Sequence, residues 1–511
     1  MASFPSNIEK RNVLPYWRSF IEAVRRGEVA SLADVSAVPI IPITTYVHDW
    51  NAFQSVAAGG DLLSAAIMNG QIDAPAVKEA ARFLLEHEDE LSAQLKRSAQ
   101  RVLYGLPEIP KANESVDALL NNREDLIRKI RILKRYNQVY SRNPVAYVEL
   151  ASYYTQIGNI ERAKEAMNIA LRIAPNQRFV SRSAARFFMH IDESDRAYSV
   201  LFHNESVKRD PWLLASEIAV STANGKVSQN IKNGQRVLES DINPYELSEL
   251  GSAIGTVEMM RGSRKKARQA MSLAIKSPND NGFAQAMWWA KHYGESVDFA
   301  RTNAYLSLYE AESIENLFQD DYEKSLSAAI KWLVQMPFSK RAALFASEVA
   351  YTYIKDYDIA NKILKVGLQA SPLDTVLLNN LAYSSALGGD VAQAEKMLKI
   401  LNAEIKKDDN IRERVCYDAT CGLTEYRKGH PDKGSELYQK AIMQAIESKD
   451  KDLANLAMLN YIREEVQYSP SFDASVLDHL DELICENQKE ADQIKKDIRA
   501  IYEKKKAGES T

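Results

Sequence analysis

We predict an all-α fold for this chain, an α-solenoid of antiparallel helix pairs, from three observations. Glycine and proline make up only about 7% of the 511 residues, against a usual share of about 12%. The composition of the whole chain, 45% apolar and 26% charged residues, is typical of a well-packed helical protein. Finally, small and large residues recur in a pattern that repeats along the chain with a fixed period. Together these features argue against disordered, collagen-like and turn-rich all-β chains.

The clearest copy of the pattern runs from Pro144 to Pro175. Large and small residues alternate in it at spacings of three and four, interrupted once by a glycine: Tyr147, Leu150, Ala151, Tyr154, Gly158, Ala163, Met167 and Ala170. This periodicity predicts two amphipathic helices joined by a turn.

Further copies follow along the chain, the two best at 341–374 and 375–408 in direct succession. The small residue that opens each second helix recurs at the same interval in two places, from Ala163 to Ala197 and again from Ala360 to Ala394. Weaker copies occupy 178–210, 211–244 and the stretches around Gly251–Pro278 and Cys421–Ala441. Between 279 and 340 the spacing is irregular, so the number of units there stays open.

This pattern resembles the tetratricopeptide repeat, in which positions 8, 20 and 27 are small and positions 4, 7, 11 and 24 are bulky. Residues 144–177 match nearly every signature position. Small residues let paired helices approach closely, while bulky ones fill the space between units. The resemblance covers roughly 140–445 and implies a right-handed superhelical α-solenoid of about eight units, some degenerate.

The array divides the chain into four parts. They are an irregular N-terminal cap or small module at 1–75, a helical lead-in at 76–143, the repeat array at 144–445, and C-terminal capping helices with a short tail at 446–511. In the first part an apolar run interrupted by Pro39 and Pro42 predicts extended chain, and Gly59 with Gly60 predicts a turn.

Net charge and cysteine content limit the kinds of partner and the cellular compartment that we expect. The formal net charge is -4, so the chain has no overall electrostatic footprint for nucleic acid or an anionic membrane, although a local basic patch stays open. The three cysteines, Cys416, Cys421 and Cys485, are too few for a disulfide framework. No apolar run reaches about 18 residues. We therefore expect a cytoplasmic protein with no membrane segment.

The sequence offers little catalytic chemistry. It contains neither glycine-rich phosphate-binding motif nor a zinc-binding pair of histidines. Cys416 and Cys421 are five residues apart without a neighbouring histidine, so we predict no metal site, no cofactor and no enzymatic activity. A catalytic triad assembled across distant segments is left open by the sequence.

The groove is the better candidate site, because the resemblance implies that first-helix residues line its concave wall. The candidate partner-binding residues are Arg182, Arg186, Phe345, Tyr353, Asn379, Asn380 and Tyr383. Arg182 and Arg186, one helical turn apart, suit the capture of a carboxylate or phosphate; the alternative is solvation or pairing within the chain. The amide of Asn380 could hold a partner's backbone, or it could cap a helix or join two repeats. The Lys and Asn pattern of repeats that clamp a chaperone's C-terminal carboxylates is absent.

These features predict a non-catalytic scaffold or regulatory subunit that grips a protein partner, an enzymatic effector being one form of partner. Two alternatives stay open. Residues 1–75 could form a small catalytic or signalling module whose substrate the repeats recruit, or the groove could bind nucleic acid, which the near-neutral charge disfavours. Homo-oligomerisation is a further possibility, through an apolar stripe that could instead cap the array: Val476, Leu477, Leu480 and Leu483.

Overall fold

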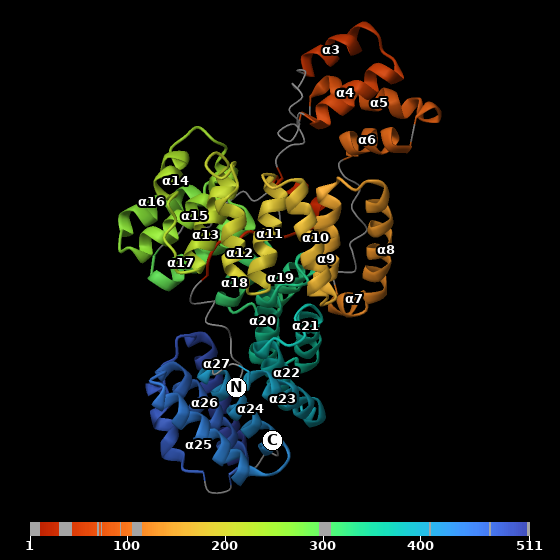
Figure 1. Cartoon of the computed structure of the whole chain (residues 1–511). Helices are drawn as coiled ribbons and strands as arrows, with labels where there is room; N and C mark the ends of the chain where they lie inside the picture. The colour runs from red at the N-terminus through yellow and green to blue at the C-terminus, as the bar shows by residue number, and fades with distance from the viewer. Residues whose placement is uncertain are drawn as a thin grey trace. The chain divides into compact units, whose positions relative to one another are not determined.

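The computed structural model describes residues 11–29, 43–68, 71–72, 74–91, 93–104, 115–295, 308–407, 410–469 and 472–507. Helices joined by short turns make up its regular structure, and none of these residues belongs to a β-strand (Figure 1). No described helix is long and apolar enough to cross a membrane. The fold is thus all-α, and it is a tetratricopeptide-like solenoid of consecutive helix pairs.

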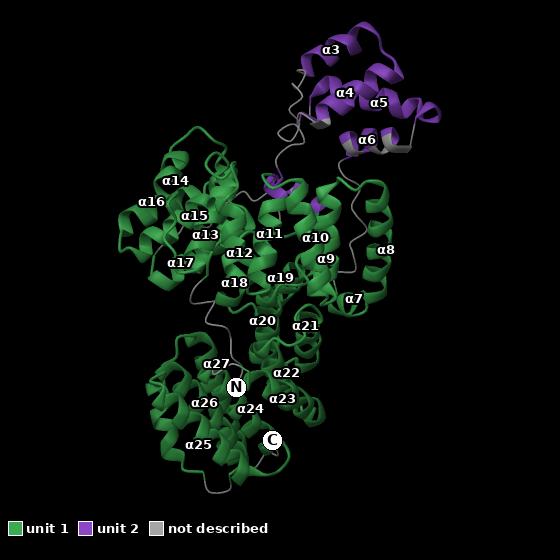
Figure 2. Ribbon diagram, viewed as in Figure 1, with its two compact units in different colours: residues 1–19, 115–176, 180–511 green, residues 20–114, 177–179 purple. Residues whose placement is uncertain are grey.

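The chain divides into two compact units (Figure 2). Unit 1 comprises residues 1–19, 115–176 and 180–511, and unit 2 comprises 20–114 and 177–179. Unit 1 contains the repeat array apart from residues 177–179, and all seven candidate groove residues belong to this unit.

The array of unit 1 begins after two lead-in helices, α7 (Val116–Leu120) and α8 (Arg123–Val139). Its pairs are α9 (Pro144–Gln156) with α10 (Ile160–Ile173), α11 (Arg178–His190) with α12 (Ser194–Phe202), α13 (Pro211–Ala223) with α14 (Ile231–Leu238), α15 (Pro244–Met260) with α16 (Arg264–Ala274), α18 (Tyr309–Phe318) with α19 (Tyr322–Gln335), α20 (Lys340–Glu348) with α21 (Tyr357–Ala370), α22 (Thr375–Leu387) with α23 (Val391–Ile405), and α24 (Ile411–Arg427) with α25 (Pro431–Glu447). Helix α17 (Asp280–Tyr293) follows α16, and α20 continues into a π-helical turn, η3 (Val349–Ile354).

The helix starts follow the local sequence. Asn143 caps α9 by accepting hydrogen bonds from the backbone N–H groups of Val145 and Ala146, and Pro144 holds the first helical position. The pair α9–α10 coincides with the clearest sequence copy, and its small residues Ala151 and Ala163 are fully buried, as the close approach of two helices requires.

The first turn of the solenoid closes on itself within unit 1. Helices α7 and α9 pack against α21, which lies several repeats further along the chain. Gly158, at a φ of +74°, lies at this contact, where a Cβ atom would come within 2.7 Å of the Gln369 carbonyl oxygen. Only glycine fits both the left-handed backbone and the close approach.

The C-terminal part of unit 1 is capped by its own helices. A core formed by Leu459, Leu480 and Ile498 joins α26 (Lys451–Tyr468), the 3₁₀-helix η4 (Ala474–Glu482) and α27 (Gln488–Lys506). The predicted apolar stripe packs into this core through all its members: Val476, Leu477, Leu480 and Leu483. In this structure the stripe therefore caps the array.

Unit 2 is helical both in the part expected to be irregular, before residue 76, and in the predicted helical lead-in that follows it. Its helices are α1 (Phe20–Arg25), α3 (Ile43–Ala52), α4 (Val56–Met68), α5 (Pro75–Glu86), η1 (Glu88–Glu90) and α6 (Ala93–Tyr104). The predicted turn at Gly59 and Gly60 is wrong, because both glycines lie inside α4. A Cβ on Gly59 would lie 3.2 Å from the Trp50 ring and 3.3 Å from Leu84, so this glycine serves close packing. The predicted extended chain at Pro39 and Pro42 lies outside the described residues.

Candidate functional site

Most of the seven predicted groove residues are buried inside unit 1. Six have small exposed fractions: Arg182 2%, Phe345 5%, Tyr353 9%, Asn379 2%, Asn380 0% and Tyr383 4%. The seventh, Arg186, lines a cavity. Arg182 and Arg186 share α11, and Asn379, Asn380 and Tyr383 share α22. Their contact with a partner stays a prediction.

Arg182 is bound within the chain. Its Nη1 and Nη2 atoms donate to the two carboxylate oxygens of Glu249 at 2.9 and 3.1 Å, and Nη1 also donates to the carbonyl of Trp212 at 3.0 Å. The Arg182 and Glu249 side chains are only 3% and 2% exposed. This ion pair ties α11 to α13 and α15, so Arg182 holds neighbouring repeats together.

The other predicted residues also join neighbouring helices. Asn379 accepts a hydrogen bond from the Thr420 hydroxyl of α24 at 2.9 Å, and Tyr383 donates to Asn460 of α26 at 2.9 Å. Two aromatic contacts complete the set: the ring of Tyr353 stacks on Tyr322, and that of Phe345 meets Trp332 edge to face. For Asn379 and Tyr383, these bonds link one repeat to another.

The chain's own N-terminal segment, residues 11–19, lies against α17 and α18 of the array. This segment has no regular secondary structure. The guanidinium of Arg11 binds both carboxylate oxygens of Glu310, at 3.0 and 2.9 Å, and donates to Gln285 at 2.7 Å. The side-chain amides of Gln285 and Asn281, on α17, donate to the backbone carbonyls of Arg11 and Leu14, each at 2.8 Å. The segment is thus held as a bound peptide would be.

Two further side chains anchor the same segment. Trp17 is 2% exposed, and its ring centroid lies 5.8 Å from that of Phe187 and 5.0 Å from that of Phe338. Arg18 donates to Asp280 at 3.3 Å and to Gln335 at 3.1 Å. This contact was not predicted from the sequence. The clustering of Tyr16, Trp17 and Arg18 in a stretch without helical periodicity is the signal that could have indicated it.

Beside the segment lies a cavity of about 950 Å³, which we call the central cavity. One wall is formed by the N-terminal segment and the other by the array; the lining residues used below are Arg11, Arg186, His190, Glu310, Lys340 and Arg341. Because the segment forms a wall without filling the space, the concave side of the array still offers room for a ligand.

The basic residues of the central cavity differ in their partners. Arg11 and Arg341 share Glu310, the latter at 3.2 Å, and Lys340 binds Asp374 at 2.9 Å. Arg186 has no such partner, since no described residue accepts a hydrogen bond from it and its Nε atom is buried and unpaired. Its nearest interaction is with the Phe338 ring, 6.0 Å from Cζ. The Arg186 side chain is half-buried with its Nε atom left without an acceptor, so an anionic group placed against it would be stabilising.

The electrostatics of the cavity agree with this geometry. Burial and the neighbouring Arg11 lower the pKa of Arg186 to about 10, which leaves the guanidinium charged at neutral pH. Burial, with Lys340 and Arg186 nearby, lowers the pKa of His190 to about 3, so this imidazole is neutral. The positive charge facing the open space is therefore that of an arginine, which suits planar recognition of a carboxylate or phosphate.

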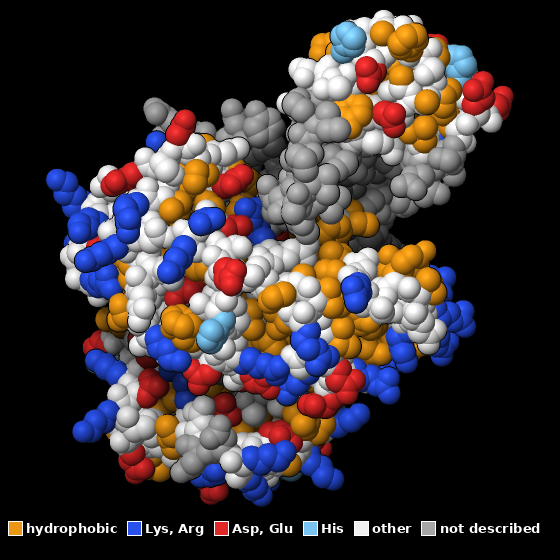
Figure 3. All heavy atoms as spheres, turned by 45° about the horizontal axis from the view of Figure 1, so that its top comes forward, with side chains coloured by type: hydrophobic (Ala, Val, Ile, Leu, Met, Phe, Trp, Pro, Cys, Tyr) orange, Lys and Arg blue, Asp and Glu red, His pale blue; other side chains and the backbone are white. Residues whose placement is uncertain are grey.

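The outer surface carries one group of basic residues on α16. Arg264, Lys265, Lys266 and Arg268 are exposed there, although Arg268 pairs with Glu295 at 2.6 Å. Figure 3 shows acidic side chains among the basic ones across the visible face. Among the described residues, no group of three histidine, cysteine or acidic side chains could hold a metal ion.

No protein-family model and no curated protein matches the chain. Among solved structures, it is similar to a chain of the APC/C hetero-tetramer Cut9–Hcn1, with 11% identity, a TM-score of 0.42, and coverage of 93% of this chain and 98% of that one. It is also similar to yeast Tom70 (12% identity, TM-score 0.31, coverage 88% and 96%) and to human IFIT1 solved as a dimer with PPP-AAAA (14%, 0.31, 94% and 99%). All three TM-scores lie below 0.5.

Proposed function

We propose that this chain is a non-catalytic, cytoplasmic scaffold or regulatory subunit, and that it binds a protein partner on the concave side of its repeat array. The observation that carries the proposal is the unpaired guanidinium of Arg186, which faces the 950 Å³ central cavity. Packing alone does not account for a half-buried guanidinium whose Nε atom is buried without an acceptor. An anionic ligand in the cavity would neutralise this charge, which supports a binding site there.

The peptide-like contacts of the N-terminal segment support a protein as the ligand. Gln285 and Asn281 already hold backbone carbonyls of this segment, so the first-helix surface is chemically suited to main-chain recognition. The buried ion pair of Arg11 with Glu310 makes the segment a lasting part of the site. The partner then enters the remaining space and meets the segment as one wall.

The charge balance of the cavity indicates the partner's chemistry. Of the lining basic residues, Arg11, Arg341 and Lys340 have carboxylate partners, and Arg186 alone among the described ones has none. A single carboxylate supplied by the partner, from an acidic side chain or a C-terminus, would complete a bidentate pair with Arg186.

The test is affinity purification of the full-length chain from its native host, with proteins identified by mass spectrometry. Arg186→Glu places a carboxylate beside Arg11, so the variant is expected to fold while its cavity repels an acidic ligand. Arg172→Glu, at an exposed position on α10, makes the same charge change away from the cavity. We expect a stoichiometric partner with the parent and with Arg172→Glu, and its loss with Arg186→Glu. Equal recovery with all three would contradict the proposal.

A further inference from the structure

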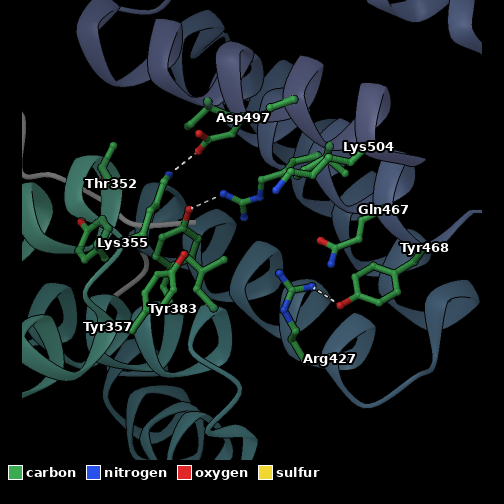
Figure 4. Close-up of a pocket in the computed structure, with 15 residues that line it drawn as sticks. Thr352, Lys355, Tyr357, Tyr383, Arg427, Gln467, Tyr468, Asp497 and Lys504 are labelled. Carbon is green, nitrogen blue, oxygen red and sulfur yellow. Dashed lines mark hydrogen bonds and ion pairs between the residues drawn. The ribbon is translucent and has the colours of Figure 1, made fainter. Parts of the chain in front are cut away.

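A second cavity, of about 550 Å³, lies in the C-terminal part of unit 1, and we call it the C-terminal cavity. It is enclosed by η3, α22, α24, α26 and α27, so the last helix of the chain forms one of its walls. Figure 4 shows Arg427 and Gln467 extending into it from two different helices. Its volume is within the range of about 300–1,000 Å³ that small-molecule sites occupy.

The lining of this cavity carries more positive than negative charge. Its basic residues come from four separate segments and are Lys355, Arg427, Arg463 and Lys504. Asp497 is the only acidic residue among the lining residues, and its carboxylate is bound by Lys355 (Figure 4).

The two arginines share one further carboxylate. Behind the lining, Glu464 is fully buried and accepts hydrogen bonds from both Arg427 and Arg463. Lys504 has no partner among the described residues, and its side chain is exposed. Two carboxylates thus face four cations, which leaves an excess of two positive charges around one cavity.

Two other carboxyl groups lie near this wall and do not cancel the excess. Glu348 and Glu490 both act on Tyr351, a lining residue. Burial raises the pKa of each, and that of Glu490 reaches about 7, helped by the nearby Asp452. The protonated, uncharged form of both carboxyl groups is thereby favoured, so they offset the positive charge only in part.

Hydrogen-bond donors are also left over at this site. The Nη2 atom of Arg463 and the hydroxyl of Tyr351 are buried, and neither has a partner within the described part of the chain. Buried donors in folded proteins nearly always find an acceptor. Both residues line the cavity, so the shortage of acceptors coincides with the shortage of negative charge.

We infer that the C-terminal cavity binds a small phosphorylated molecule that carries at least two negative charges. Two guanidinium groups and two ammonium groups from four separate segments suit the several oxygens of phosphate groups, and a single carboxylate would leave part of the excess charge unpaired. The tyrosine hydroxyls of the lining supply further donors. This site is separate from the central cavity, so the inference stands independently of the proposed protein partner.

The test is isothermal titration of the full-length chain with pyrophosphate, inorganic phosphate and citrate at matched ionic strength. We expect saturable binding of pyrophosphate, about tenfold weaker binding of phosphate, and citrate binding at least about tenfold weaker than pyrophosphate. No saturable pyrophosphate binding, or citrate binding as tight as pyrophosphate, would overturn the inference.

Variants locate the binding. Lys504→Gln removes an exposed charge of the lining and should keep the fold, and its matched control is Lys506→Gln, an exposed position on α27 outside the cavity. Arg463→Lys keeps the charge that faces Glu464 and removes the planar fork. We expect pyrophosphate to bind several-fold more weakly to Lys504→Gln and about tenfold more weakly to Arg463→Lys, with Lys506→Gln unchanged.

Urea unfolding without pyrophosphate shows that each variant is folded before titration. If folded Lys504→Gln and Arg463→Lys both bind pyrophosphate as tightly as the parent, the inference is wrong.

Discussion

The two cavities of unit 1 are each lined by four lysine and arginine residues, yet they differ in acidic residues. The central cavity has four among its lining residues, Asp192, Glu310, Asp374 and Glu486, whereas the C-terminal cavity has Asp497 alone. In the central cavity, ion pairs with carboxylates leave only Arg186 of the described basic lining residues unpaired. In the C-terminal cavity, the excess positive charge is shared by all four basic lining residues. The balance of charge in a cavity, more than the number of its basic residues, therefore indicates what the cavity can bind.

The same contrast exists within one helix. Arg182 and Arg186 are one turn apart on α11, but Arg182 is saturated by Glu249 and Trp212, whereas Arg186 faces open space. We interpret the first arginine as part of the structure and the second as part of a binding site.

Arg182→Met should destabilise the protein strongly. It leaves the Glu249 carboxylate buried without its ion-pair partner, and breaking a buried pair from one side costs about 3–5 kcal/mol. The free energy of unfolding in urea measures the loss, with the exposed Arg172→Met as the control. A loss below about 1 kcal/mol would show that Arg182 is not structural.

Trp17→Ala should cost about 3 kcal/mol, because the indole packs against Phe187 and Phe338 inside the array. The change tests whether the N-terminal segment is a lasting wall of the central cavity. Hydrogen exchange at residues 11–19 should rise in the variant. Unchanged stability together with unchanged exchange would mean that the segment contributes nothing to this wall.

Stability should depend on pH through Glu490 in the C-terminal part. Burial raises the folded-state pKa of this group to about 7, above its ordinary value of 4.5. Its contribution to stability is therefore complete below about pH 4.5 and is lost as the pH rises towards 7. Glu490→Gln keeps an acceptor for Asn487 and should flatten this decline. Urea unfolding of parent and variant at pH 5 and pH 8 compares them, and parallel curves would contradict the prediction.

Arg186→Met should have the smallest effect on the isolated protein, within about 1 kcal/mol of the parent and with a tendency to stabilise, because no internal partner is lost. Arg182→Met and Arg186→Met make the same change at two positions of one helix, so the difference between their free energies of unfolding reports the difference in pairing. Equal destabilisation by both would remove the distinction between them.

The repeat pattern predicted much of the fold because it reports local packing. Small residues such as Ala163 and Ala360 sit where two helices of a pair meet, so their spacing reveals the pair without knowledge of distant contacts. Gly59 misled the analysis, since a glycine needed for close approach to Trp50 resembles one needed for a turn.

The candidate site could be predicted only in part. The sequence indicated Arg182 and Arg186 as a pair, but it did not show which of them keeps its charge unpaired. That depends on distant residues: Glu249 binds Arg182 from 67 residues away, and Glu310 binds Arg11 from 299 residues away. Periodicity holds no information on such long-range ion pairs. The same reason hid the C-terminal cavity, where Lys355 and Asp497 meet across 142 residues.

The most direct test of the central claim is site-specific photo-crosslinking in the native host. A diazirine amino acid at Met189, a residue of α11 that lines the central cavity, would capture whatever occupies it, and the same group at the exposed Gln269 of α16 is the control. We predict a crosslink from position 189, absent from position 269, to one protein at a peptide that contains an acidic residue or a C-terminus. Crosslinks from position 189 to this chain alone would contradict the account.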